Sequence, residues 1–422
     1  MQVTERLDAA FAETMDAFQP FEKNPVFATA LSGGADSTAL CRMAEKYAAR
    51  VNGTVLALIV NHNLRPESKT EAEAVARQCA ERHVPFEILT VDTPPVARLE
   101  ETARKMRYRL LFDACKKRDC FYLLTGHHAK DVSETVAMRR SHRSGVAGLA
   151  GINACQSADF GFLIRPLLRF SPDDLRTYNR ENNLSWVEDS TNSSDVFERN
   201  RIRKTLSAVS CDNELKIAEN ASESRRKTES ETDAFLARFA RFDASGTVFF
   251  TRAAVHAASD AHWLGDVLRF VGQKPYAPNA DSLQTALLRL KSPDFKGLSL
   301  GGCFIASLSK EGIYICRESN NMPAAKNVVN AATVSWGIFH FRISEPFTGT
   351  VRALGNEKIP EKIKTALPKR CFKTLPAFFD KQGLFLVPHL GYKRKSIACE
   401  TTFAPKYRAG RDIGWIFNKA VK

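Results

Sequence analysis

Short runs of apolar residues, separated by longer stretches with helical periodicity, fill the N-terminal half of the chain. The runs cover residues 26–31, 55–60, 86–91 and 121–126. Each is apolar through its centre instead of alternating with polar residues, which is typical of strands covered by helices on both faces. The helical patterns between them cover residues 38–50, 67–82 and 99–118. This order predicts an α/β fold with an open, doubly wound, mostly parallel sheet.

The pattern changes after about Cys211. Residues 212–242 form one long and strongly polar helical pattern, and the polar, turn-prone stretch at 317–327 is typical of a linker. Strand patterns follow at 333–344 and 383–390. We therefore predict three domains: a catalytic α/β domain at 1–211, a helical connector and middle domain at 212–325, and a small, basic α+β C-terminal domain at 326–422.

The charge of the chain is strongly positive and unevenly distributed. Lys and Arg number 61 against 47 Asp and Glu, a formal net charge of +14. Residues 357–411 alone hold 13 basic and 4 acidic side chains. A surplus of this size favours a polyanionic partner, most simply nucleic acid. A basic surface that only contacts solvent is the alternative.

Cysteine spacing and hydropathy exclude several classes of protein. The ten cysteines include no Cys-x-x-Cys pair, so neither a zinc site nor a redox pair is indicated. Buried free thiols in a reducing cytoplasm are the expected state. The first residues carry acids and lack the apolar core of a signal peptide. No segment approaches the ~18 uninterrupted apolar residues of a membrane span, so we expect no membrane partner.

The first apolar run ends in a turn that suits an anion. Ser32-Gly33-Gly34-Ala35-Asp36-Ser37 follows the run and opens the next helical pattern. Adjacent glycines permit positive φ and close approach of the backbone to a phosphate. Successive amide groups, together with a helix N-terminus, then bind the anion. The Gly-Lys-Ser/Thr of a Walker loop is missing. A turn that only caps the helix is the alternative.

This six-residue motif resembles the pyrophosphate-loop (PP-loop) signature of the N-type ATP pyrophosphatases, which cleave ATP between its α- and β-phosphates. Further motifs occur in the same order as in the tRNA(Ile)-lysidine synthase family. They are VNHNLRPES (60–68), ARKMRY (103–108), TGHHAKDVSET (125–135), SGVAGLAGI (144–152), IRPLL (164–168) and WVEDSTNSSDVFERNRIR (186–203). Residues 375–393 resemble the C-terminal domain of that family. The resemblance implies an adenine nucleotide alpha hydrolase-like fold for the first domain.

The resemblance also implies a reaction. The 2-oxo group of the wobble cytidine, in the isoleucine tRNA with a CAU anticodon, attacks the α-phosphate of ATP and releases pyrophosphate. The side-chain amine of free L-lysine then displaces AMP from the same carbon and forms lysidine. The implied cofactors are ATP and Mg²⁺, and the implied partners are tRNA(Ile) and lysine in the cytoplasm. The protein mainly positions the reactants and stabilises developing phosphate charge.

Candidate roles follow for the residues of the matched motifs. The ATP phosphates are expected at Ser32, Gly33, Gly34, Ala35, Asp36 and Ser37, and Asp36 is the candidate Mg²⁺ ligand. Asp131 and Glu134 lie on one face at the start of a predicted helix. They are candidates to bind the amines of lysine or to help hold Mg²⁺, and N-terminal helix capping is the alternative.

Basic residues complete the candidate site. Arg104 and Arg107 share a helix face, and one of them is a candidate for phosphate or for the lysine carboxylate; a solvated helix face is the alternative. His127 and His128 end a predicted strand at the ligand-binding edge of the sheet. Neither a cysteine nor a third histidine lies nearby in the sequence, so we do not expect this pair to bind a metal. The last cluster is suited to tRNA phosphate or to the adenylate, with a solvated turn as the alternative. Its members are Arg199, Asn200, Arg201 and Arg203.

The chain departs from the family pattern in three places. Asn61 and Asn63 stand where the family usually has Asp and Gly, and Lys130 stands where it usually has the first of two successive acids. His142-Arg143 replaces an Arg-Gly pair. Two carboxylates are lost and one position gains a positive charge. These changes bear on the number of Mg²⁺ ions and on the tightness of nucleotide and lysine binding.

Three other functions share parts of this pattern. Related enzymes that thiolate cytidine carry paired Cys-x-x-Cys ligands, and these are absent here. Amidotransferases with the same loop need a glutaminase segment, often with an N-terminal nucleophilic cysteine, whereas this sequence starts Met-Gln-Val. A catalytically silent RNA-binding relative is the alternative from a different class. Pyrophosphate release in the presence of tRNA separates these possibilities.

Overall fold

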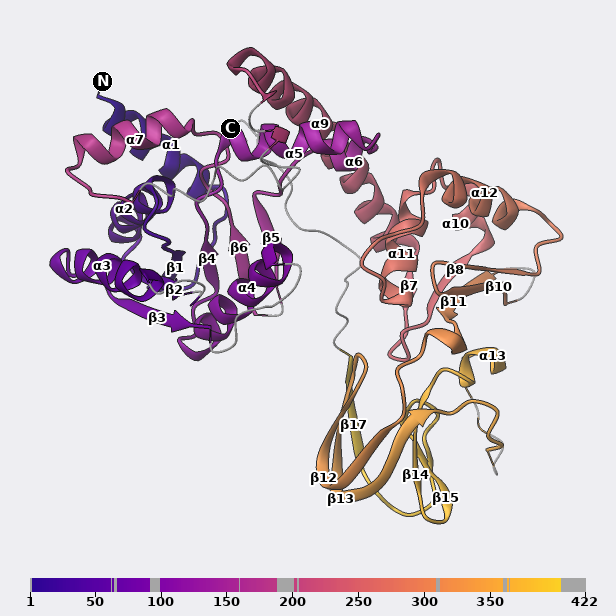
Figure 1. The fold of residues 1–422 in the computed structure, drawn as a ribbon. Coiled ribbons are helices and arrows are strands. Elements are labelled where there is room, and N and C mark those ends of the chain that lie inside the picture. Colours follow the sequence, from indigo (N-terminus) through magenta and orange to yellow (C-terminus); the bar gives the residue numbers. More distant parts are fainter. Residues whose placement is uncertain are drawn as a thin grey trace. The chain divides into compact units, whose positions relative to one another are not determined.

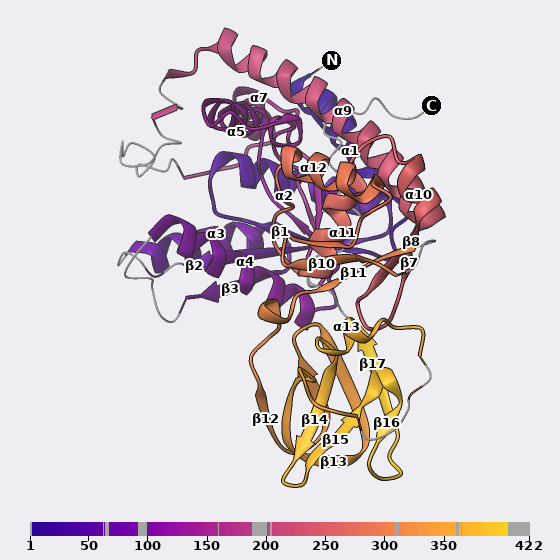
Figure 2. The ribbon, with the colours of Figure 1, turned by 90° about the vertical axis from the view of Figure 1, so that its right-hand side faces the viewer.

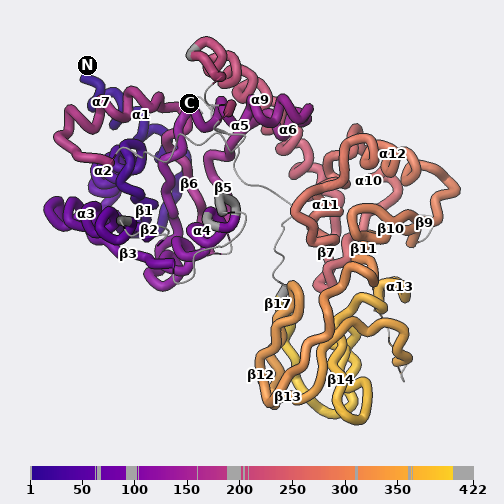
Figure 3. Tube along the Cα trace, in the orientation of Figure 1, coloured from indigo at the N-terminus to yellow at the C-terminus, as the bar shows by residue number. Residues whose placement is uncertain are grey.

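A computed structural model shows the chain as two compact units, one formed by the described residues up to Lys227 and the other by those from Thr228 onward. Figure 1 shows the fold as a ribbon and Figure 3 as a Cα trace. The structure describes residues 2–61, 63, 67–91, 99–158, 160–187, 201–202, 205–308, 312–359, 363 and 365–403.

A six-stranded sheet organises the first unit, with strand order β3-β2-β1-β4-β6-β5. The strands are β1 (Val26–Ala30), β2 (Thr54–Asn61), β3 (Phe86–Thr90), β4 (Tyr122–Leu124), β5 (Cys155–Ser157) and β6 (Phe162–Ile164). All neighbouring pairs are parallel except β5 with β6. The order runs outward in both directions from β1, so the topological switch point lies between β1 and β4.

Helices cover both faces of this sheet. They are α1 (Val3–Asp16), α2 (Ala35–Arg50), α3 (Glu67–Glu81), α4 (Leu99–Lys117) and α7 (Pro172–Glu181). Strand residues alternate between two cores: Phe27 packs with α1, α2, α3 and α7, whereas Ala28 packs with α4. Because successive strand side chains point to opposite faces, each strand must be apolar throughout, as its sequence is.

Two further helical segments complete the first unit. Helix α5 (Ala129–Ser141) follows β4, and the short α6 (Val146–Leu149) follows α5. The long polar helix α9 (Ala208–Phe239) begins in the first unit, and its last residues belong to the second. Its first half packs on α5: the Ser133 hydroxyl donates to the Cys211 carbonyl (3.1 Å), and Arg140 pairs with the buried Glu214 (2.6 Å).

The second unit begins with a five-stranded antiparallel sheet of order β7-β8-β11-β10-β9. The strands are β7 (Arg241–Phe242), β8 (Val248–Thr251), β9 (Gly297–Leu300), β10 (Cys303–Ser307) and β11 (Gly312–Arg317). Helices α10 (Arg252–Ala257), α11 (His262–Gly272) and α12 (Ala280–Lys291) accompany it. Residues of these helices pack with strand residues around the buried Trp263, which is 2% exposed.

A second sheet of six strands lies in the same unit and is visible in the rotated view of Figure 2. Its elements are β12 (Lys326–Trp336), β13 (Phe339–Ala353), β14 (Pro376–Asp380), β15 (Gly383–Val387), β16 (Tyr392–Lys393) and β17 (Cys399–Phe403), with α13 (Lys369–Phe372) before β14 and short 3-10 turns at Ser319–Asn321 and Pro388–Leu390. One core joins the two sheets, because Phe249 and Tyr314 of the first pack with Leu375 and Leu390.

The predicted fold class is confirmed, with specific differences. The four predicted N-terminal strands and three predicted helices are present to within a few residues. The sequence analysis missed β5 and β6, each of three residues. It also expected a helical middle segment, and α10–α12 are there, but the five-stranded sheet was not anticipated. The three-domain division stays a prediction.

Two predictions about the chain as a whole have structural outcomes. All ten cysteines are free, and eight of them are buried, as expected for core thiols. Within the described ranges, no helix combines the length and the apolar character needed to cross a bilayer.

Candidate active site

The PP-loop lies where the topology predicts a ligand, directly after β1 at the switch point of the sheet. Gly34 precedes the first residue of α2, and the loop is folded around the Ser37 hydroxyl. That hydroxyl donates to the Gly34 carbonyl (3.0 Å) and accepts from the Ser32 amide (3.1 Å). The loop therefore holds its backbone turned at the N-terminus of a 16-residue helix, where amide groups and the helix dipole favour an anion.

Two glycines make this turn possible. Gly33 has φ +84°, and a Cβ there would lie 2.6 Å from Cγ2 of Val75. Gly126, just after β4, faces the loop from the other side of the switch point. A Cβ on Gly126 would lie 3.2 Å from both the Asp36 carbonyl carbon and the Ser37 amide nitrogen. The loop is thus in close backbone contact with the segment that follows β4.

A Gly126→Ala variant tests this contact. The added methyl group meets backbone, which yields less easily than a side chain, so we expect the loop to shift by a few tenths of an ångström. Overpacking of this kind costs about 1–3 kcal/mol, and we expect most of it as a roughly 10-fold rise in KM for ATP. Gly145→Ala is the matched control, because a Cβ there meets nothing within 4 Å. Equal KM values for the two variants would contradict the contact.

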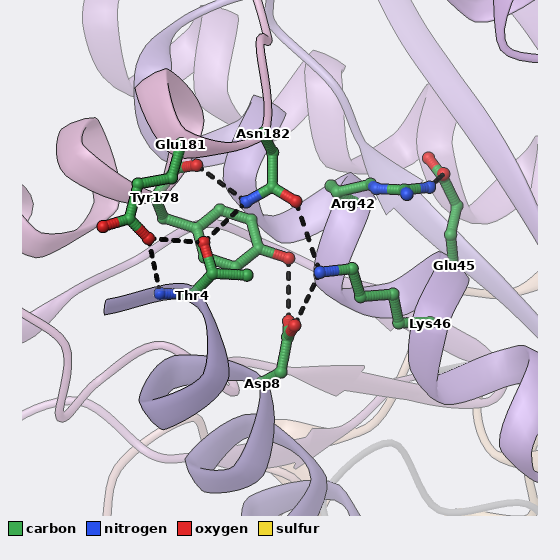
Figure 4. Close-up of polar contacts among 8 residues, drawn as sticks. All are labelled: Thr4, Asp8, Arg42, Glu45, Lys46, Tyr178, Glu181 and Asn182. Atoms are coloured by element: carbon green, nitrogen blue, oxygen red, sulfur yellow. Dashed lines mark hydrogen bonds and ion pairs between the residues drawn. The ribbon is translucent and has the colours of Figure 1, made fainter. Parts of the chain in front are cut away.

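Helix α7 and the residues that follow it support the PP-loop through hydrogen bonds. The fully buried Asn179 donates its side-chain amide to the Ala35 carbonyl (2.8 Å), and the Val187 amide donates to the Gly33 carbonyl (2.9 Å). Figure 4 shows the polar contacts that fasten α7 to α1 and α2. Lys46 binds Asp8 (2.6 Å), and Asp8 accepts from the Tyr178 hydroxyl (2.7 Å). These contacts make α7 part of the support of the nucleotide loop.

His128 connects the loop to α5. It precedes α5 as the N-cap residue, and its Nε2 lies 3.5 Å from Asp36 and its Nδ1 3.4 Å from Asp131. Burial alone would lower the pKa of His128, but the hydrogen bond with Asp36 and the charges of Asp131 and Glu134 outweigh it, so the pKa is raised above its ordinary value. His128 thus joins two candidate carboxylates.

The acids of α5 have two different surroundings. Asp131 accepts a hydrogen bond from the His128 amide (2.9 Å), so the capping role considered as the alternative is present. This leaves its second role, toward lysine or Mg²⁺, a prediction. Glu134 is fully buried, and its charge helps to raise the pKa of His128. His127 is half-buried, with its Nδ1 3.0 Å from the Thr125 hydroxyl.

The two arginines of α4 converge on one tyrosine. The guanidinium groups of Arg104 and Arg107 lie 5.0 Å and 5.7 Å from the ring centre of Tyr108. Arg165, which follows β6 and was not singled out from the sequence, is 6% exposed. Burial lowers the pKa of its guanidinium, and Tyr108 acts in the opposite direction. Its motif, IRPLL, gave the only sequence signal for it. The three arginines are brought together by the fold.

The residues that depart from the family pattern can be placed individually. Asn61 ends β2 next to β1, and its side-chain oxygen accepts from the Asn63 amide (2.9 Å). Asn63 has φ +51°, which an asparagine tolerates better than most residues. Lys130 lies in the first turn of α5, and His142-Arg143 follows its end. Of the last basic cluster, Arg201 is exposed, while Arg199, Asn200 and Arg203 lie outside the described residues.

Known proteins match this chain along most of its length. The PP-loop domain family matches residues 3–209. The tRNA(Ile)-lysidine synthase of Hyphomonas neptunium is 31% identical over 308 residues, which cover 71% of this chain and 83% of that protein. The enzyme of a Wolbachia of Brugia malayi is 27% identical over 93% of this chain and 94% of its own length. For the enzyme of Orientia tsutsugamushi the identity is 32%, and this chain spans 46% of that protein.

A PP-loop at the switch point of a doubly wound sheet defines an ATP-binding protein of the PP-loop class. Within this class, the chain belongs to the tRNA(Ile)-lysidine synthase family. The resemblance seen in the motifs is therefore confirmed, and so is the expected kind of activity, an ATP-using ligase that modifies tRNA.

Proposed function

We propose that this chain ligates free L-lysine onto the wobble cytidine of the AUA-reading isoleucine tRNA, in the cytoplasm, with ATP and Mg²⁺. The observation that carries the proposal is the intact PP-loop at the switch point of a chain from the lysidine synthase family. The reaction has two displacements. The cytidine 2-oxo group bonds to the α-phosphorus of ATP as pyrophosphate leaves. The lysine ε-amine then bonds to C2 of the base as AMP leaves and the amine loses a proton.

The positions of the site residues suggest which substrate each group binds. The PP-loop amides bind the ATP phosphates, which places the α-phosphate at the carboxyl edge of β1 and β4. Asp131 and Glu134 of α5 are next to the loop through His128, and we assign them to the amines of lysine. An amine must be neutral to attack, so a carboxylate beside it that accepts its proton assists the second displacement. Arg199, Asn200, Arg201 and Arg203 are assigned to the tRNA or the adenylate by family resemblance.

The donor set around the loop fits a magnesium ion shared with ATP. No cluster of three or more His, Cys, Asp or Glu side chains suited to a metal occurs among the residues the structure describes. Mg²⁺ commonly uses one or two carboxylates and takes its other ligands from phosphates and water. Asp36 offers such a carboxylate, with its side chain 36% exposed at the loop. Bound there, Mg²⁺ would neutralise phosphate charge during the first displacement.

Pyrophosphate release tests the whole proposal. Full-length protein, Mg-ATP and an isoleucine tRNA transcript with a CAU anticodon are incubated with and without L-lysine. We expect roughly one equivalent of pyrophosphate without lysine and continuous release of pyrophosphate and AMP with it, together with labelled lysine in the tRNA. A thiolating enzyme would be indifferent to lysine. A silent RNA-binding relative would release no pyrophosphate, and either result would refute the proposal.

Lys130 allows a separate prediction about the metal. Its ammonium occupies the first turn of α5, where the family usually has an acid, and it can neutralise phosphate charge in place of a second metal ion. We expect Lys130→Asp to make the activity depend more steeply on Mg²⁺ concentration, with a higher Hill coefficient in the magnesium titration. An unchanged titration would show that this side chain has no part in nucleotide binding. Lys116→Asp, an exposed lysine of α4, is the control.

A further inference from the structure

Helix α7 carries a polar residue on the face that it buries. Three of its side chains are buried, those of Leu175, Tyr178 and Asn179, and their spacing places them on one face of the helix. Leu175 and Tyr178 pack in the core that α7 shares with α1 and α2. Asn179 is 0% exposed on the same face. Burial of a side-chain amide is unfavourable unless hydrogen bonds replace those that it makes with water.

Only one end of this amide has a partner. The nitrogen donates to the Ala35 carbonyl of the PP-loop (2.8 Å), whereas the buried Oδ1 accepts no hydrogen bond from any residue that the structure describes. A buried acceptor without a donor destabilises the fold. A leucine has the same branching as Asn179 and would avoid this cost. The arrangement therefore indicates that the amide nitrogen serves the PP-loop and not the stability of the core.

Two carbonyl groups held from the α7 side fix the direction of two amides of the PP-loop. Asn179 binds the Ala35 carbonyl, and the Val187 amide, which follows α7 in the chain, binds the Gly33 carbonyl (2.9 Å). A carbonyl and the amide of the next residue belong to one planar trans peptide group, and they point in opposite directions. The two amides that follow these carbonyls therefore point away from α7. Both lie at the N-terminus of α2, where amides lack partners inside the helix and favour an anion.

Helix α7 can hold the loop because contacts with α1 and α2 fix the helix itself (Figure 4). The Asn182 side chain at the end of α7 donates to the Thr4 hydroxyl of α1 (2.9 Å) and accepts from Lys46 of α2 (3.3 Å). The Thr4 amide donates to Glu181 of α7 (2.8 Å). None of these contacts involves the PP-loop. The position of Asn179 is therefore set by the surrounding helices, and the loop takes its orientation from this residue.

We propose that Asn179 is a positioning residue for ATP, which turns the amides of the PP-loop toward the phosphates without touching the nucleotide. This inference rests on the proposed function. The unpaired Oδ1 lowers the stability of the fold, and the fixed direction of the loop amides is what the residue contributes in return. Removing the amide should therefore weaken the binding of phosphate groups and leave the fold as stable as before. A residue needed only for packing would show the opposite behaviour.

The test separates the binding of phosphate groups from the binding of the rest of the nucleotide. Isothermal titration calorimetry on the full-length protein measures the affinities for Mg-ATP, inorganic pyrophosphate and adenosine, without tRNA or lysine. In Asn179→Leu we expect about 10-fold weaker binding of ATP and of pyrophosphate, the size of one hydrogen bond. Adenosine binding should be unchanged. The midpoint of thermal unfolding should not fall, because the unpaired oxygen is removed together with the hydrogen bond.

Two further variants sharpen the result. In Asn179→Asp, which keeps the size of the side chain, an acceptor faces the Ala35 carbonyl and a negative charge lies near the phosphates. We therefore expect a larger loss of ATP and pyrophosphate affinity than in Asn179→Leu. Leu175→Met is the matched control in the same core, since Leu175 is also 0% exposed, and all three affinities should stay unchanged. In tRNA modification, Asn179→Leu should raise KM for ATP and leave KM for lysine unchanged.

Three outcomes would overturn the proposal. One is an equal loss of adenosine and pyrophosphate affinity in Asn179→Leu, or the same loss in Leu175→Met, because a loosened core would explain either. Another is a markedly lower unfolding midpoint in Asn179→Leu, which would make the residue structural. The third is an unchanged pyrophosphate affinity in Asn179→Asp. Failure of the proposed function looks different: the phosphate affinities would shift as expected, and the wild type would add no lysine to the tRNA.

Discussion

Replacing Asp36 by alanine should reduce lysine incorporation by at least about 1,000-fold and leave the fold intact. The carboxylate lies at the N-terminus of α2 beside His128, where it is placed to hold magnesium on the ATP phosphates. Loss of a charge that stabilises the transferring phosphate costs several kcal/mol of transition-state stabilisation, about 4 for a 1,000-fold effect. The measurement is single-turnover lysine incorporation at saturating Mg-ATP.

Stability must be measured in the same experiment, because Asp36 is paired with a buried histidine. The side chain is about one-third exposed, so we expect the midpoint of thermal unfolding to change by only a few degrees. Asp113→Ala, an exposed carboxylate on α4, is the control and should keep normal turnover. Turnover like the wild type in Asp36→Ala would remove this residue from the active site.

The second large effect that we expect is on the affinity for tRNA. Lys369 and Lys373, in and just after α13, are exposed and form no ion pair with any described residue. Arg394 and Lys395, also in the basic C-terminal region, are paired with acids. We expect the double variant Lys369→Glu, Lys373→Glu to bind tRNA at least about 10-fold more weakly at 0.1 M salt and to lower the salt slope by about 2, because each lost phosphate contact lowers it by about 0.9. Filter binding across a salt series measures both quantities.

Lys116→Glu with Lys117→Glu makes the same change of charge in the first unit and is the control. These lysines end α4 and are exposed. Arg370 is left unchanged, because its guanidinium lies 3.5 Å from the ring centre of Phe304 and supports the unit. Equal losses of affinity in both double variants would mean that binding depends on net charge alone, and the C-terminal region would not be the docking surface.

Removing the chain from β12 onward would be a poor test of tRNA binding by the C-terminal region, although the sequence suggests a linker there. The apparent linker at 317–327 separates two sheets in the chain, but residues of both sheets share one core. Removing the second sheet would expose Phe249 and Tyr314, which are now 6% and 5% exposed. Exposing large apolar surface of this kind destabilises what remains. Charge reversal keeps the unit folded and isolates the electrostatic term.

The sequence predicted best where local patterns and tertiary demands agree. The apolar run of β1, the PP-loop and the start of α2 follow one another directly in the chain. Each can be predicted from its own residues, as a buried strand, a turn that needs glycine and an amphipathic helix. Helix α7 also had a readable start, since Pro172 is its first residue and the Ser171 hydroxyl accepts from the Asp174 amide (3.0 Å). That signal was overlooked.

The parts that were missed depend on contacts between distant segments. Strand β5 has only three residues, Cys155–Ser157, and is formed by pairing with β6, so no run of apolar residues in the sequence marks it. Arg165 lies in the IRPLL motif, but nothing in that motif indicates a chemical role for the arginine. It joins Arg104 and Tyr108 only because β6 and α4 meet on one face of the sheet, across about sixty residues of chain. Pairings of this kind become visible only once the topology is known.

The reactivity of the buried free cysteines can be used to measure local unfolding of each unit. Cys41 and Cys79 lie in the core of the first unit, and Cys303 and Cys371 lie in cores of the second. Burial raises the pKa of Cys41 to about 12 and of Cys79 to about 11, so these thiols react slowly until the surrounding structure opens. Alkylation followed by mass spectrometry would therefore give a separate opening free energy for each unit, and added ATP should slow the labelling of Cys41 and Cys79 alone.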